Sequence, residues 1–207
     1  MRDNPSIDEH FMNLPMSLSA PAPRRPLHNR TIVCEGFQRE DRLFDIEARI
    51  VDTKAYAYSE PFRGHREPGD PVHDMRVRLT VGEDMVVRDI EVAMPATPYT
   101  LCQSAKPNFK GLIGVKIGGG WRRAVQDAVG AVKGCTHVRE LLFPMATVAF
   151  QTIGGWRSEG DGPREAPMQR GGKPYFIDGC IAWASDGEVV ATLHPEFAGK
   201  SSPSGTV

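Results

Sequence analysis

Thiol and imidazole side chains fall at the boundaries of three elements that the sequence predicts. His73 opens a strand with Asp74 beside it, Cys102 lies in a short helix, and Cys135 and His137 open a long helix. Thiolate sulfur and neutral imidazole are the usual ligands of zinc and iron, and a carboxylate can replace one of them. The sequence therefore predicts a zinc or iron site among these five residues. The alternative is that the cysteines and His73 are ordinary core residues.

The spacing of these donors limits the metal prediction. No C-x-x-C pair occurs, so the pattern is not that of a zinc finger. Cys135 and His137 would lie about 200° apart in a regular helix, so both can bind one ion only if residues 134–137 form a non-helical lead-in. If Cys135 instead caps the helix, the helix N-terminus lowers its thiol pKa and makes it a candidate nucleophile.

A second cluster consists of charged residues on an apolar strand face. Asp52 and Lys54 continue the face that carries Ile46 and Ile50. Charges on an inward face cost several kcal/mol unless they are paired, so this placement predicts an acid–base pair lining a cavity. The alternative is that the strand has left the core by residue 52. We take Asp52, Lys54, His73 and Arg78 as candidate catalytic residues, although Arg78 is predicted on the face opposite His73.

The elements that position these residues follow from hydrophobic periodicity. Period-two alternation predicts strands over 31–37, 43–54, 72–81 and 85–92, and helical spacing predicts helices over 99–105, 121–129 and 136–153, the last kinked at Pro144. In the last helix Val138, Leu141 and Leu142 form the apolar stripe. If this helix runs parallel to strand 72–81, Cys135 and His137 meet His73, and Cys102 joins them. Strands followed by helices indicate an α+β domain, an antiparallel meander with helices on one face.

The chain divides into four parts by composition. Residues 1–26 form a Pro-rich arm, 27–153 an α+β core, 154–174 a Gly/Pro-rich linker, and 175–207 a C-terminal extended segment or hairpin. Residues 59–71, rich in Pro and Gly, are predicted to be a loop. The apolar content of the C-terminal segment predicts that it docks on the core or on a second subunit.

Composition excludes several classes of protein. The 207 residues carry a formal charge of −1 and are 40% hydrophobic, so neither nucleic-acid binding nor global disorder is expected. No apolar run is long enough for a membrane span, and four cysteines in a protein predicted to be cytoplasmic are expected to stay reduced. Gly118-Gly119-Gly120 lacks a P-loop register, so no nucleotide cofactor is expected. A homodimer is left open.

Two resemblances extend these predictions. Pro26-Leu27-His28, Val51-Asp52-Thr53-Lys54, Pro71-Val72-His73-Asp74-Met75 and Gly134-Cys135-Thr136-His137, with Glu140-Leu141-Leu142, resemble a bacterial family that carries only a domain-of-unknown-function designation. This resemblance implies a role in the breakdown of aromatic or other small carbon sources, with formaldehyde-releasing lyase chemistry on lignin-derived aromatics.

More distantly, the order of elements from Gly69 onward resembles the iron–sulfur scaffold fold of the NifU/IscU type. Gly69-Asp70-Pro71 would deliver the first ligand, Cys102 the second and Cys135 the third. Val72 or His73 replaces the first thiol of that pattern, which favours zinc or mononuclear iron over a cluster.

The functional hypothesis from the sequence is a carbon–carbon lyase acting on a small aromatic substrate. Release of formaldehyde needs a base, for which His73 or Lys54 is suited, and an electron sink, for which Arg78 or a metal is suited. The alternative is a non-enzymatic metal or iron–sulfur scaffold or carrier protein.

Overall fold

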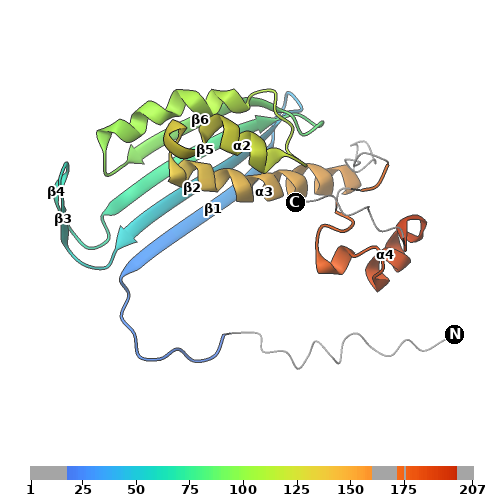
Figure 1. Cartoon of the computed structure of the whole chain (residues 1–207), viewed down its shortest axis with the longest axis horizontal. Coiled ribbons are helices and arrows are strands. Elements are labelled where there is room, and N and C mark those ends of the chain that lie inside the picture. The colour runs from blue at the N-terminus through green and yellow to red at the C-terminus, as the bar shows by residue number, and fades with distance from the viewer. Residues whose placement is uncertain (1–17, 160–171, 175, 200–207) are drawn as a thin grey trace.

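A four-stranded antiparallel sheet forms the base of the protein (Figure 1). The computed structural model describes residues 18–159, 172–174 and 176–199. The strand order is β1-β2-β5-β6, and the strands are β1 (His28–Gln38), β2 (Phe44–Lys54), β5 (Pro71–Val81) and β6 (Val87–Ala96). The short strands β3 (Tyr58–Glu60) and β4 (Gly64–Arg66) form a separate hairpin between β2 and β5. The predicted meander and the α+β class are confirmed.

The alternation of apolar and polar residues decides which face of the sheet is buried. The side chains of one face are buried at every second position from Phe44 to Asp52 in β2 and from Met75 to Val81 in β5, because successive residues of a strand point to opposite faces. The buried residues of these two strands are Phe44, Ile46, Ala48, Ile50, Met75, Val77, Leu79 and Val81. Asp52 continues this buried face and is itself 1% exposed, so the strand has not left the core at that point.

The helices cover this one face of the sheet (Figure 1). They are the 3-10 helix η1 (Thr100–Leu112), α2 (Trp121–Val129), the short η2 (Ala131–Lys133) and α3 (Thr136–Glu159). The apolar stripe of α3 is fully buried at Val138, Leu141, Leu142, Met145, Ala149 and Ile153. The Trp121 indole ties α2 to α3 by donating a hydrogen bond to the Leu142 carbonyl at 2.9 Å.

Helix α3 runs in the same direction as β1 and β5. Its first turn carries His137 next to His73, which lies near the start of β5. Its later part crosses β1 near that strand's end, where a Cβ on Gly36 would come within 1.9 Å of the Thr152 hydroxyl. Helix α3 is therefore parallel to β5, which is the condition under which His137 was expected to meet His73.

Three sequence predictions differ from the structure. Residues 59–71 contain the β3–β4 hairpin instead of only a loop. Helix α3 extends to Glu159, so the predicted linker starts six residues too early. The C-terminal hairpin is absent from the described residues, because η3 (Ile181–Trp183), α4 (Glu188–Leu193) and η4 (Pro195–Phe197) occupy this segment; Tyr175 lies outside the described residues.

The C-terminal segment has a small apolar cluster of its own. Ile177 and Val190 are buried, and the Phe176 ring lies 4.5 Å from the Trp183 ring and 5.4 Å from His194. Ile181 and Leu193 remain exposed. Docking of this segment on the core or on a second subunit stays a prediction. In the part of the chain that is described, no helix is both long and apolar enough to cross a membrane.

Candidate functional site

A buried carboxylate gathers an arginine and three histidines at one end of the sheet. Asp52 accepts two hydrogen bonds from Arg30, Nε to Oδ1 at 2.7 Å and Nη2 to Oδ2 at 2.8 Å. His73 Nδ1 lies 2.9 Å from Asp52 Oδ2. His28 Nε2 and His137 Nε2 lie 3.4 and 3.8 Å from the carboxylate oxygens. We call His28, Arg30, Asp52, His73 and His137 the Asp52 cluster.

Strand register and helix position bring these five side chains together. Arg30, Asp52 and His73 are direct cross-strand partners on β1, β2 and β5, so they share the helix-covered face of the sheet. His137 comes from the first turn of α3, and its ring lies 3.7 Å from that of His73, centroid to centroid, with a tilt of 30°. The two imidazoles therefore stack above the carboxylate.

The electrostatics of the cluster keep Asp52 ionised. Burial of the Asp52 carboxyl raises its pKa, but the hydrogen bonds and charge of Arg30, followed by those of His73, outweigh burial and hold the pKa below its ordinary value. The Asp52 hydrogen bonds in turn raise the pKa of Arg30. Arg30 and Asp52 thus form an ion pair, with 2.7 Å between Arg30 Nε and Asp52 Oδ1.

The same surroundings favour neutral imidazoles. Burial lowers the pKa of His73 and exceeds the opposing effect of its hydrogen bond to Asp52. Burial, then the nearby His73 and Arg30, lowers the pKa of His137. An ionised carboxylate only accepts hydrogen bonds, so His73 donates from Nδ1 to Asp52. In the neutral ring this leaves a lone pair on Nε2, ready to take a proton or a metal ion.

Three groups of the cluster could hold a metal ion. Asp52, His73 and His137 each offer one ligand atom, and these atoms all lie within 4.8 Å of one another. Nitrogen and carboxylate ligands of this kind suit zinc or iron. Because Arg30 already occupies both oxygens of Asp52, the carboxylate is also placed to act as the outer partner that orients a ligating imidazole.

Two of the predicted site residues lie on the helix-free face of the sheet, as the strand period predicts, and not in the Asp52 cluster. Asp74, predicted as a metal ligand, points to the helix-free face, where its carboxylate accepts hydrogen bonds of 2.9 and 2.8 Å from Arg49. Arg78, predicted as the electron sink, lies on that face too and binds Glu47 at 2.7 Å and Glu91 at 3.1 Å. Each lies an odd number of residues from His73 along β5, so its side chain points to the other face and does not reach the Asp52 cluster.

The other predicted site residues, Cys102, Cys135 and Lys54, do not belong to this group of metal ligands. The Cys135 thiol is 3.7 Å from the Met75 sulfur, and Cys102 is partly buried against the hydrophobic core. The Lys54 ammonium lies 3.9 Å from the centre of the Tyr58 ring. Among the described residues, the group of at least three mutually close metal ligands contains no cysteine. All four cysteines are free.

Sequence reasoning missed Arg30 and His28. The first strand was predicted to start at residue 31, whereas it starts at His28. Extending the alternation of Ile32 and Cys34 backwards would have placed both residues on the inward face. The signal in the sequence was a buried aspartate that needs a cationic partner. Lys54 was predicted for this role, whereas Arg30 fills it in the structure.

The β3–β4 hairpin stands beside the cluster. The Arg63 guanidinium binds Glu60 and donates hydrogen bonds to the carbonyls of Pro71 and Val72, immediately before His73. Next to Arg63, the exposed Phe62 ring makes an edge contact of 5.6 Å with Tyr99. Aromatic side chains are therefore exposed at the same end of the sheet as the imidazoles.

The fold and the cluster define an α+β protein with a histidine–carboxylate site. Cross-strand partners of β1, β2 and β5 and the first turn of α3 form this site. The chain belongs to the family described as protein of unknown function (DUF2889), whose model matches residues 28–151. The match begins at the first residue of β1 and ends within α3, so it contains the whole Asp52 cluster. Searches of the curated proteins and of the solved structures each returned no match.

Proposed function

We propose that the chain is a small-molecule enzyme in which His73, oriented by Asp52, acts as the general base. The observation that supports this proposal is the 2.9 Å contact between His73 Nδ1 and a buried carboxylate that is already neutralised by Arg30. A fixed imidazole with an available Nε2 and a pKa below its ordinary value is suited to accept protons near pH 7. Asp52 holds the tautomer and stabilises the imidazolium that forms.

The reaction we propose is a carbon–carbon lyase step that releases formaldehyde. His73 takes the hydroxyl proton of a hydroxymethyl group, the C–O bond becomes C=O, and the C–C bond breaks with its electron pair left on the remaining fragment. That fragment then takes a proton, for which protonated His73 is placed. Arg30, in contact with Asp52, replaces Arg78 as the cation nearest this chemistry.

The substrate class we propose is a lignin-derived or similar aromatic compound. The sequence resemblance suggested this class, and the exposed aromatic pair of Phe62 and Tyr99 beside the cluster supports it. The aromatic ring of the substrate would pack on these side chains while its hydroxymethyl group faces His73.

The experiment is a turnover assay with a panel of hydroxymethyl-bearing aromatic compounds and detection of formaldehyde. We expect release of formaldehyde by the wild type, a loss of at least 100-fold in His73→Gln, and no change in His65→Gln, which alters an exposed histidine of the hairpin. Equal turnover in the wild type and His73→Gln would refute the role of His73. No formaldehyde from any compound would refute the lyase assignment.

A second candidate function is metal binding without catalysis, as in a carrier or scaffold protein. The three ligand atoms within 4.8 Å favour it. Titration of chelator-treated protein with Zn²⁺ or Fe²⁺ should then show one saturable site that His137→Gln weakens at least tenfold. If that site is present and turnover is absent, the carrier function replaces the lyase.

A further inference from the structure

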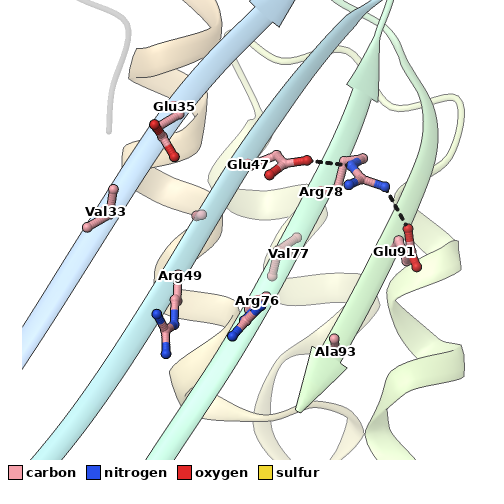
Figure 2. Close-up of a pocket in the computed structure, with 10 residues that line it drawn as sticks. Val33, Glu35, Glu47, Arg49, Arg76, Val77, Arg78, Glu91 and Ala93 are labelled. Atoms are coloured by element: carbon pink, nitrogen blue, oxygen red, sulfur yellow. Dashed lines mark hydrogen bonds and ion pairs between the residues drawn. The ribbon is translucent and has the colours of Figure 1, made fainter. Parts of the chain in front are cut away.

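The face of the sheet that the helices leave uncovered contains a hollow. The Asp52 cluster lies on the other, helix-covered face. Figure 2 shows it from this face, with side chains of all four long strands around it. Its volume is about 430 Å³, within the range of small-molecule sites. The helices lie behind the sheet in this view, so the hollow and the Asp52 cluster are separate sites.

Two cross-strand rows of side chains give the hollow its charge pattern. Val33, Arg49, Arg76 and Ala93 are successive cross-strand partners from β1 to β6. The neighbouring row consists of Glu35, Glu47, Arg78 and Glu91. The first row therefore has two cations between two small apolar residues, and the second has three carboxylates and one cation. Short side chains at both ends of the first row leave space beside the arginines.

The two arginines of the first row share one carboxylate. Like charges directly opposite each other on neighbouring strands are destabilising unless an anion lies between them. Asp74 binds Arg49 through both of its oxygens at 2.9 and 2.8 Å, whereas its contact with Arg76 is 3.6 Å. The Arg76 side chain is also 54% exposed. By contrast, Arg78 contacts two glutamates at 2.7 and 3.1 Å. Within the described part of the chain, Arg76 therefore has weaker carboxylate contacts than Arg49 and Arg78.

We propose that this hollow binds a small organic monocarboxylate with a compact apolar body. The ligand's carboxylate takes the planar donors of Arg76 and the positive field of Arg49, a geometry in which guanidinium and carboxylate match. Its apolar body lies on Val33 and Ala93. The carboxylates of the second row repel a second negative group, so a dianion such as inorganic phosphate is rejected.

The test is a titration of the full chain with sodium benzoate at low ionic strength. Binding is monitored by the amide chemical shifts in NMR spectra. Benzyl alcohol serves as the neutral analogue and inorganic phosphate as the dianion. We expect saturable shifts for benzoate at the amides of Val33, Arg49, Arg76 and Ala93, and at least tenfold weaker binding of the other two probes. Shifts at Asp52 and His73 instead would assign benzoate to the Asp52 cluster and overturn the proposal.

Variants separate the arginine site from general surface charge. Arg76→Gln should weaken benzoate at least tenfold, while Arg88→Gln, which removes an exposed arginine paired with Asp84, should leave it unchanged. Among the described residues, the shortest contact of Arg76 with a carboxylate is the one of 3.6 Å, so Arg76→Gln should keep the thermal midpoint of the wild type. Equal benzoate affinity in Arg76→Gln and wild type, or phosphate binding as tight as benzoate, would overturn the proposal.

Discussion

Asp52 is the residue on which the candidate site depends. Its carboxylate is buried and receives hydrogen bonds from both Arg30 and His73. The Arg30 side chain is 39% exposed, so water can partly solvate its charge, but Arg30 and His73 both lose their acceptor when the carboxylate is removed. The site is therefore also a point of high sensitivity for the stability of the sheet.

Asp52→Asn tests this dependence. The substitution leaves Arg30 and His73 without their charged acceptor, so we expect the free energy of unfolding to fall by about 1–3 kcal/mol in urea denaturation. Asp127→Asn is the matched control, because Asp127 pairs with Arg123 on the exposed surface of α2 and should cost less than about 0.5 kcal/mol. Equal decreases in the free energy of unfolding for the two substitutions would show that the contacts of Asp52 stabilise the protein no more than an exposed ion pair does.

The histidines give stability a defined dependence on pH. His73 and His137 have pKa values below the ordinary value of 6.5, so the unfolded chain binds more protons than the native protein as pH falls through that value. Stability must then rise with pH in this window. We expect the free energy of unfolding, measured in urea with a chelator present, to be lower at pH 5.5 than at pH 7.5.

Variants assign this pH dependence to residues. His137→Gln should flatten the difference between the two pH values, whereas His65→Gln, at an exposed position, should retain it. If the wild type is as stable at pH 5.5 as at pH 7.5, the imidazoles are not held neutral by burial.

About half of the site could be predicted from residue types and alternation. Asp52 and His73 were placed on one face because both continue apolar alternations, and His137 followed from the direction of α3. Asp74 and Arg78 were assigned on residue chemistry against the strand period, which puts them on the other face. Arg30 and His28 were missed because a polar strand end looks like a loop when no neighbouring strand is known.

At the scale of elements, the approach of α3 to β1 depends on Gly36. A Cβ at this position would lie 1.9 Å from Thr152 Oγ1 and 2.8 Å from its Cβ, and a β-branched side chain cannot swing away freely. We expect Gly36→Ala to lower the free energy of unfolding by about 1–3 kcal/mol in urea denaturation. Gly119→Ala, where a Cβ would meet nothing within 4 Å, is the control. A neutral Gly36→Ala would mean that α3 packs less closely on the sheet.

The four long strands and α3 were predictable because each carries a continuous hydrophobic period over at least seven residues. The β3–β4 hairpin was not, because its strands are three residues long and are stabilised by side-chain contacts such as Arg63 with Glu60. The segment Glu188–Leu193 alternates weakly and is short, so local turns and ring contacts decide in favour of a helix there.

At the scale of the whole molecule, the core should fold without its terminal segments. The hydrophobic core lies within residues 44–153, and the described residues before Leu27 are exposed. We expect a truncated chain of residues 25–159 to stay monodisperse and to unfold cooperatively in urea. Aggregation of this truncated chain would show that the arm or the C-terminal segment covers an apolar surface.

The central claim is that His73 is held by Asp52 as a neutral imidazole with a free Nε2. The most direct measurement is ¹⁵N NMR of the histidine side chains of the full chain across pH 5 to 8. We predict at pH 7 a protonated Nδ1 and an unprotonated Nε2 for His73, with a midpoint below 6.5. A His73 ring that carries both protons at pH 7 would be a structural cation paired with Asp52, and would contradict both the general base and the metal-ligand role.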